Sequence, residues 1–473
     1  MKSSAKTRSR FAFKSGIVGK GTALTGKELV DIDRALGETR ERMGAQFTPT
    51  QVLGRRDPIG CVALEITQRC NLDCTLCYLS DNSEDVKDIP IEEVYRRLDG
   101  IKDHYGAGTV VQITGGDPTL RKRQELVDIV RYTRSLGLQP ALFTNGILAS
   151  RALLIDLVNV GLVDIAFHVD LTQEREGYDS EKALNAIRSE YIDRARGLPL
   201  TVIFNTTIFA GNFNEIPDLI RFFRANTDVV RFASFQLQAD TGRGELTSRH
   251  QVISVETVRE QISKGADMDL DWDPVMIGHP KCHSYVPTFA INGNLYNVVD
   301  GESFLAEAME EFKDIYCDRR NGVIPNALPY LKAALWKPKW IPRVLGYLLR
   351  RGWKARKDII AARGQILRLS FFIHNFMDAS ALDEERIEAC SFMVMTHDGP
   401  VSMCEHNAKR DEYILTPLKI RSADGEERIW EPLKERKRVR RKARGERDWK
   451  ESPAASLAEE PFEKSLAEGG GAK

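Results

Sequence analysis

Residues 62–80, VALEITQRCNLDCTLCYLS, place three cysteines directly after a short apolar run. The run is typical of a buried strand, and Cys70, Cys74 and Cys77 follow it with the spacing C-x3-C-x2-C. Thiolates are favoured ligands of zinc and of iron–sulfur clusters. Three thiolates leave a four-coordinate zinc site incomplete, but they can bind three irons of a cubane and leave the fourth iron open. The alternative is a group of buried thiols that bind nothing.

The same strand begins a regular alternation that extends from about residue 60 to 240. Further β-rich runs are TVVQIT (109–114), PALFTN (140–145), VDIAFHV (163–169), LTVIFNTTI (200–208) and VRFASFQLQ (230–238), and amphipathic segments of helical period separate them. Strands that alternate with helices predict βα units and a parallel sheet. We therefore expect an α/β fold, a partial (β/α)6 TIM-type barrel with a smaller C-terminal domain.

Changes in composition divide the chain into four parts. Residues 1–56 are polar and basic and are interpreted as an N-terminal extension, followed by the core barrel over 57–250. The C-terminal domain is expected over 251–423. Residues 424–473 are charge-dense and then rich in Ala, Glu and Gly, which predicts a disordered tail.

Composition also limits the class of protein. The chain has 473 residues and eight cysteines, and its longer charge-free stretches are interrupted by polar residues, so no transmembrane helix is expected. The basic N-terminus lacks the apolar segment of a secretory signal. Cysteines in such a chain indicate reduced thiols or metal ligands rather than disulfides, and the predicted compartment is the cytoplasm.

A second motif, TGGDPTLR at 114–121, ends the second predicted strand. Gly115 and Gly116 permit close approach of the backbone to a ligand, and Asp117-Pro118 favours a turn. Alone, this pattern is typical of any βα turn. Together with the three cysteines it indicates a cofactor site at the carboxyl ends of the strands, where barrels of this type place their active sites.

With both motifs, residues 60–240 resemble the radical S-adenosylmethionine (SAM) superfamily. The resemblance implies that the three cysteines bind a [4Fe-4S] cluster whose open iron chelates SAM. One-electron reduction of the sulfonium would release methionine and a 5′-deoxyadenosyl radical, which abstracts hydrogen from a C–H bond. A small reductant protein of the flavodoxin or ferredoxin type is the implied electron donor. The resemblance leaves the residues that act on the substrate unknown.

The resemblance also implies a set of SAM contacts. Gly115, Gly116 and Asp117 match the GGEP-type motif that contacts the methionine amino group, with Asp in place of the usual Glu. Leu76 occupies a position that is usually aromatic and lies by the adenine, and Tyr78 follows it. The remaining candidates, for ribose, methionine or adenine, are Asn145, Asp170, Asn205 and Ile208. Each of these polar residues, taken alone, is equally typical of a strand end.

Four further cysteines, Cys282, Cys317, Cys390 and Cys404, lie outside the predicted barrel. Four thiolates saturate a second cubane, so an auxiliary [4Fe-4S] cluster is predicted, with His283 and His406 as reserve ligands. The alternative is that they are small buried apolar residues. Cys61, at the start of the first strand, is expected to be structural.

The segments 279–300 and 376–407, around these cysteines, are similar to the auxiliary-cluster region of the tetraether-synthase-like radical SAM proteins. That resemblance implies a substrate among the alkyl chains of membrane lipids. Three cubanes would need more cysteines than the eight in this chain, so two auxiliary clusters cannot both bind on cysteine alone.

Residues 328–363 are basic and aromatic, with ten Lys or Arg against one Asp. Trp336, Trp340 and Trp353 beside basic residues suit the surface of an anionic bilayer, and Pro338 and Pro342 are expected to break the segment into short pieces. The alternative is a helical hairpin that covers the barrel. The basic run 434–444 is interpreted as solvated, without a specific nucleic-acid partner.

The sequence therefore predicts a radical SAM enzyme that modifies the alkyl chain of a membrane lipid or another apolar substrate, located peripherally at the inner membrane face. Two alternatives remain open. One is a peptide-modifying radical SAM maturase with an auxiliary cluster. The other, of a different class, is a non-catalytic zinc protein that binds nucleic acid.

Overall fold

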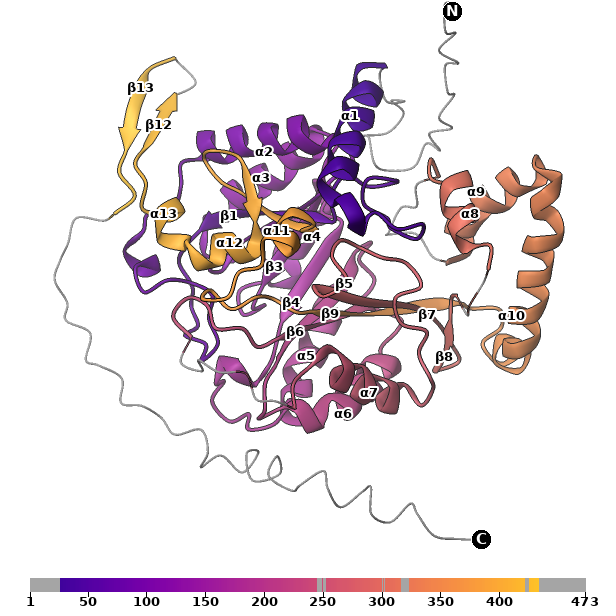
Figure 1. The fold of residues 1–473 in the computed structure, drawn as a ribbon. Helices are drawn as coiled ribbons and strands as arrows, with labels where there is room; N and C mark the ends of the chain where they lie inside the picture. Colours follow the sequence, from indigo (N-terminus) through magenta and orange to yellow (C-terminus); the bar gives the residue numbers. More distant parts are fainter. Residues whose placement is uncertain are drawn as a thin grey trace, which may run out of the picture.

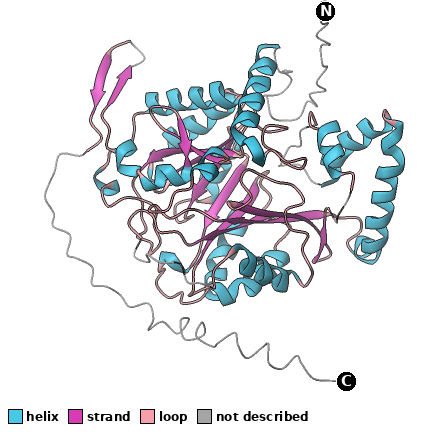
Figure 2. Cartoon of the chain, in the orientation of Figure 1, coloured by secondary structure: helices cyan, strands magenta, loops and turns pink. Residues whose placement is uncertain are grey.

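The computed structural model describes residues 26–244, 249, 252–299, 301, 303–315, 323–421 and 425–433. Its first six strands are β1 (Cys61–Thr67), β2 (Val110–Gly115), β3 (Gln139–Thr144), β4 (Asp164–His168), β5 (Thr201–Ile208) and β6 (Val230–Leu237). They lie side by side, in parallel and in chain order (Figure 1). Helices α2 (Ile91–Tyr105), α3 (Arg123–Ser135), α4 (Arg151–Asn159), α5 (Glu181–Ala195) and α6 (Ile216–Ala225) connect them (Figure 2). The predicted α/β fold with a partial barrel is confirmed.

The apolar patterning explains why these segments form these elements. Every residue of β1 is buried, as expected for a strand covered on both faces. Helix α2 buries Val94, Leu98 and Ile101, which share one face at helical spacing. These side chains join a continuous hydrophobic core between the sheet and its helices.

The C-terminal part of the chain extends the same sheet at both edges. Strand β9 (Leu367–His374) lies parallel to β6, and β10 (Phe392–Met395) lies parallel to β1. β7 (His283–Ile291), β8 (Asn294–Asn297) and β11 (Pro400–Ser402) complete it, so that among the described residues eleven strands form one sheet, in the order β11-β10-β1-β2-β3-β4-β5-β6-β9-β7-β8. Residues 251–423 are therefore joined to the barrel by backbone pairing, and their division into a separate domain stays a prediction.

The N-terminal helix α1 (Gly26–Met43) also lies against the barrel. Ile32, Leu36 and Met43 are buried, and the amide of Val52 donates to the carbonyl of Met276 at 2.8 Å. The other elements are α7 (Val255–Ala266), α11 (Glu384–Glu388), α12 (Met403–Ala408), α13 (Arg410–Ile414), β12 (Leu418–Arg421) and β13 (Glu427–Trp430). Residues 26–56 are thus part of the folded body of the protein.

A helical appendage projects from the β7–β8 edge of the sheet (Figure 1). It consists of α8 (Leu305–Glu311), α9 (Val323–Leu335), η6 (Pro338–Trp340) and α10 (Ile341–Ala361). α10 is one continuous helix, not the short pieces that the prolines predict. Pro342 occupies its first turn, where an N–H has no partner within the helix anyway. Cys317 and the basic run 434–444 lie outside the described residues.

A buried ion pair fastens the C-terminal segment to the first strand. The guanidinium of Arg410 donates to both carboxylate oxygens of Glu65 at 2.8 Å, and Gln68 adds a further donor at 2.8 Å. Burial alone would raise the pKa of Glu65, but Arg410, His406 and Gln68 outweigh it and lower this pKa to about 2. Glu65 is therefore ionised and paired in the folded protein at every pH above that value.

We expect Glu65→Gln to lower the free energy of unfolding at pH 7 by about 3–5 kcal/mol, because it leaves Arg410 buried without its counter-charge. The deficit relative to wild type should shrink as the pH falls from the ordinary 4.5 of a glutamate towards about 2, since the depressed pKa stabilises wild type only above that window. Urea titrations at several pH values measure both effects. Glu38→Gln, which removes an exposed pair with Arg34, is the control and should change stability by less than about 1 kcal/mol. Equal effects of the two substitutions would contradict the prediction.

Candidate active site

The cysteine loop rests directly on the glycine pair that follows β2. The amide of Gly116 donates to the carbonyl of Thr67 at 2.9 Å, and the amide of Asp117 donates to that of Arg69 at 2.8 Å. A Cβ on Gly115 would lie 1.9 Å from the Thr67 oxygen, and one on Gly116 would lie 2.0 Å from the Arg69 oxygen. Both positions therefore require glycine, and this contact fixes the chain as it enters the cysteine loop.

The three cysteines open onto a cavity of about 540 Å³ inside the barrel. The predicted cofactor residues that share this cavity are Leu76, Tyr78, Gly115, Gly116, Asn145 and Asn205. Asn145 also approaches the sulfur of Cys70, with its Nδ2 at 3.9 Å. Burial raises the pKa of Cys70 and raises that of Cys74 well above the usual value, so both thiols are neutral before they bind a metal.

The cysteines are not arranged around a single metal ion. In the described part of the chain, no three His, Cys, Asp or Glu side chains form a site for one ion. Thiolates that bind separate irons of a cluster stand farther apart than thiolates that share one ion, because the cluster lies between them. The donor set itself, three cysteines on the wall of one cavity, fits a cluster with one open iron.

Arg243, which the sequence analysis did not single out, lies against the cysteine loop. Its amide donates to the carbonyl of Leu79 at 2.8 Å, and a Cβ on the preceding Gly242 would lie 2.6 Å from the carbonyl oxygen of Cys77. Burial alone would lower the pKa of Arg243, but the Cys77 sulfur, Asp73 and Glu84 raise it. The guanidinium of Arg243 thus places a positive charge next to the sulfur of Cys77. The sequence signal was TGRG (241–244), two glycines around an arginine just after β6.

Two predicted cofactor ligands, Asp117 and Asp170, have their carboxylates turned into the structure. Asp117 is fully buried and accepts from the amide of Asn145 at 2.9 Å and from the hydroxyl of Thr144 at 2.8 Å, which ties the loop after β2 to the end of β3. Asp170 likewise accepts from the amide of Thr207 at 2.7 Å and ties the end of β4 to β5. We infer that these two residues shape the rim of the cavity.

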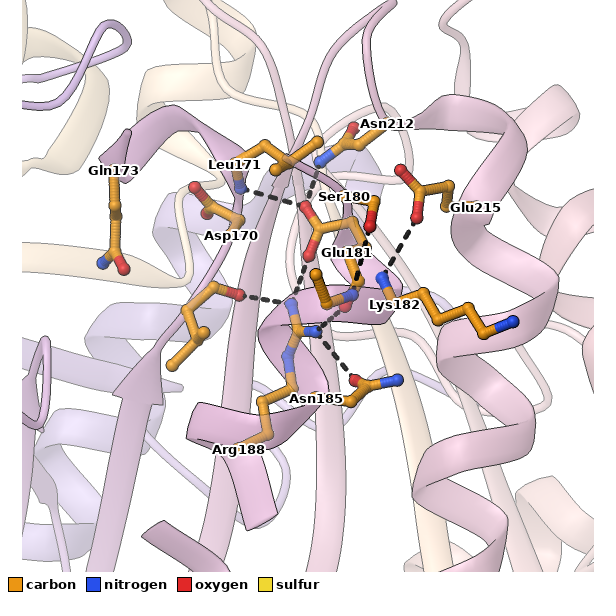
Figure 3. Close-up of polar contacts among 12 residues, drawn as sticks. Asp170, Leu171, Gln173, Ser180, Glu181, Lys182, Asn185, Arg188, Asn212 and Glu215 are labelled. Carbon is orange, nitrogen blue, oxygen red and sulfur yellow. Dashed lines mark hydrogen bonds and ion pairs between the residues drawn. The ribbon is translucent and has the colours of Figure 1, made fainter. Parts of the chain in front are cut away.

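Further polar contacts hold the backbone on either side of Asp170 (Figure 3). The buried carboxylate of Glu181 accepts from the amide of Leu171 at 3.1 Å, from Asn212 at 2.7 Å and from the guanidinium of Arg188. Arg188 also donates to the carbonyl of Val169 at 2.8 Å. These contacts hold the backbone on both sides of Asp170 in place.

Two side chains, His168 and Tyr78, add polar groups to the end of the cavity near the cysteines. His168 lines it and contacts Asp170 at 2.8 Å and the hydroxyl of Thr207 at 3.1 Å through Nε2. Tyr78 donates its hydroxyl to the carbonyl of Gly115, and Arg410 lies 4.6 Å from the centre of its ring. Ile208, a candidate for adenine packing, is part of the hydrophobic core, and its role stays a prediction.

Three of the four outer cysteines lie close together in the interior. Cys282, Cys390 and Cys404 are each buried, and they influence one another electrostatically. Burial raises the pKa of all three, that of Cys404 to about 12. Their sulfurs already accept hydrogen bonds, from Arg386 Nε to Cys282 at 3.2 Å and from the Met377 amide to Cys404 at 3.4 Å.

The reserve histidines lie in the same region as these cysteines. His283 follows Cys282 and His406 is in the same helix, α12, as Cys404; both are buried, and burial lowers the pKa of His406 to about 4. Within the described ranges the Nδ1 atom of each has no hydrogen-bond partner. Neutral imidazoles with an unused nitrogen are suited to metal ligation.

Comparisons with known proteins agree with this site. Residues 64–223 match the Radical SAM superfamily. The chain is 26% identical over 423 residues to 7,8-dihydro-6-hydroxymethylpterin dimethyltransferase of Methanocaldococcus jannaschii, a match that covers 80% of each protein. It is 32% identical over 172 residues to the PqqA peptide cyclase of Methylobacterium nodulans, covering 34% of this chain and 42% of that one.

The match to a GTP 3',8-cyclase of Chlorobaculum tepidum is similar in extent, with 29% identity over 46% of this chain and 64% of the cyclase. Among solved structures, SuiB of Streptococcus suis bound to its precursor peptide SuiA aligns over 52% of each chain, with 16% identity and a TM-score of 0.37. The structural match thus spans about half of either protein.

We expect Gly116→Ala to reduce the iron and sulfide bound per chain, because the new Cβ forces the cysteine loop away from its docked position. Iron and sulfide assays on anaerobically purified protein, with the visible absorption spectrum, measure the loss. Gly37→Ala is the matched control, since a Cβ there meets nothing within 4 Å. Wild-type iron content in the Gly116 variant would show that the glycine contact does not position the ligands.

Proposed function

We propose that the protein, a SAM-dependent enzyme with a radical SAM domain over residues 64–223, abstracts hydrogen from the alkyl chain of a lipid or of a similarly elongated apolar molecule. The family implies a [4Fe-4S] cluster, SAM and an electron donor, for which we propose a flavodoxin or a ferredoxin. Once bound and reduced, the cluster and SAM supply a 5′-deoxyadenosyl radical. The protein itself must bind the substrate, exclude water and align the reacting carbon.

The shape of the cavity carries this proposal. It begins at the cysteines and extends through the barrel to the opposite ends of the strands, where Val110, Asp164 and Thr201 line it. Several of the residues that line it along the way are small, namely Cys61, Ala63, Ala141, Ala166, Ser234 and Ser370, beside larger ones such as Phe143 and Ile203. Bulky branched side chains usually fill such a barrel. Here the interior leaves room for an extended molecule.

The lining of the cavity suits a substrate with an apolar chain and a polar end. Phe232, Phe372 and Phe392 contribute aromatic wall, and each CH₂ of a substrate buried there would gain about 0.8 kcal/mol. At the end far from the cysteines, Arg231 and Arg368 both border the cavity. Burial and the neighbouring Arg368 lower the pKa of Arg231. An anionic group of the substrate bound beside Arg231 would counteract this shift, because it favours the charged guanidinium.

We also propose that Cys282, Cys390 and Cys404 bind a second iron–sulfur cluster. The N–H donors that already reach two of the sulfurs would serve thiolates, and His283 or His406 could complete the ligand set. This cluster would lie beside β10 and β9, the strands that pair with β1 and β6. That position suits electron transfer or contact with the substrate.

The proposed location is the cytoplasmic face of a membrane. In the part of the chain that the structure describes, no helix combines the length and apolar character needed to cross a bilayer. A lipid substrate would therefore have to be taken up from the membrane surface.

We expect Ala166→Phe to lower the turnover of a lipid substrate at least about tenfold, because the ring fills the part of the cavity that the alkyl chain would occupy. Iron content and the slow dithionite-dependent release of 5′-deoxyadenosine without substrate should persist. The assay compares a total lipid extract in detergent micelles with a peptide mixture, using mass spectrometry of both. Ala152→Phe, on the exposed side of α4, is the control. Modification of peptides, and not of lipids, would favour the maturase alternative.

We expect Cys282→Ala/Cys390→Ala/Cys404→Ala to lose about four irons per chain while the SAM-cleaving cluster persists. Iron and sulfide counting, together with electron paramagnetic resonance of the reduced protein, separates the two clusters. Cys61→Ala, which removes a buried thiol elsewhere, should leave the count unchanged. An unchanged count in the triple variant would refute the second cluster.

A further inference from the structure

Helix α10 is fixed to the β7–β8 hairpin by one face only. Tyr347 donates its hydroxyl to the carbonyl of Val298 at 2.8 Å, and the carboxylate of Asp358 accepts from Asn292 at 3.0 Å and from Asn294 at 2.9 Å. These contacts define the inner face of the helix. The opposite face points away from the sheet (Figure 1).

That outer face is mainly apolar, contrary to the usual pattern of a surface helix, although the exposed Arg356 also lies on it, 4.2 Å from the centre of the Trp353 ring. Leu345, Leu349, Trp353 and Ile360 follow one another at spacings that place them on one side of α10, and their exposed fractions are 53%, 71%, 71% and 77%. The helix therefore presents an exposed stripe where charged side chains would be expected.

Helix α9 and the turn after it add to the same kind of surface. Ile324, Leu328 and Leu335 share one side of α9 and are about half to two-thirds exposed, and Trp336 is 89% exposed. The appendage meanwhile has a small core of its own, formed by Phe312, Ala334 and Trp340. The exposed residues are thus additional to what the appendage needs to fold. We call them, with those of α10, the outer apolar surface.

Positive charge flanks this surface. Helix α10 contains six Lys or Arg and a single acidic residue, Asp358, which is held on the inner face. Arg350 and Lys357 project beside the apolar stripe and are exposed. Indole and aliphatic side chains next to basic ones match the interface of an anionic bilayer, where apolar burial and charge attraction add together.

We propose that the outer apolar surface of α9 and α10 docks the protein on a membrane that contains anionic lipid. The place where α9 and α10 join the barrel would bring the cavity close to the membrane. This link between docking and substrate rests on the proposed function. Arg56 donates to the hydroxyl of Tyr330 in α9 at 3.2 Å, and the nearby Val52 and Leu53 line the cavity. α10 leads into β9, which carries Arg368 at the cavity end far from the cysteines. A docked protein would turn this end of the barrel towards the lipid.

Vesicle flotation with the full-length, cluster-loaded protein tests the docking. We expect wild type to float with vesicles of phosphatidylglycerol and phosphatidylcholine and to float much less with phosphatidylcholine alone. Leu349→Ser/Trp353→Ser should weaken flotation at least about tenfold. Arg350→Glu/Lys357→Glu should remove the preference for the anionic lipid. Ile155→Ser/Ile429→Ser, which removes exposed apolar residues elsewhere, should float like wild type.

Three outcomes would count against docking. Absence of flotation by wild type, or equal flotation of the Leu349/Trp353 variant, would overturn it. So would a change in that variant from dimer to monomer in light scattering without vesicle binding, since the surface would then join two copies of the chain. Turnover in detergent micelles separates the two proposals. Docking without any lipid turnover would refute the proposed substrate alone, whereas wild-type turnover in micelles by a variant that no longer floats supports both.

Discussion

The contact between the cysteine loop and the glycine pair is the constraint on which the site depends. It joins two neighbouring strands by main-chain hydrogen bonds, Gly116 to Thr67 and Asp117 to Arg69, at distances that admit no side chain on the glycines. Because the bonds are between backbone groups, they fix the path of the chain rather than one rotamer. The cysteines follow within a few residues, so the same contact positions them before they bind a metal.

Buried carboxylates extend this order around the rim of the barrel. Asp117 and Asp170 each bind the end of the next strand, and Glu181 supports the second of them through Arg188. A carboxylate that accepts several internal donors is fixed in place. The rim is therefore rigid, while the space within it remains open to a cofactor and a substrate.

Local patterns were enough to predict the strands, the helices between them and the cysteine and glycine motifs, because each of these depends on residues close in sequence. The pairing of β10 with β1 and the ion pair between Glu65 and Arg410 join residues hundreds of positions apart, and no local pattern encodes them. Asp117 shows a second limit. Its position suggested a cofactor contact, but only the structure reveals that Thr144 and Asn145 already occupy its oxygens. The contacts with SAM stay predictions.

The small residues inside the barrel, such as Ala63, Ala141 and Ala166, have an energetic consequence of their own. A cavity lacks the dispersion contacts that large side chains would make there. The fold is less stable as a result. A molecule that fits the hollow restores those contacts and binds only the native state. Binding of a ligand in the cavity therefore raises the stability of the fold. A rise in melting temperature would identify the natural substrate even when no reaction occurs.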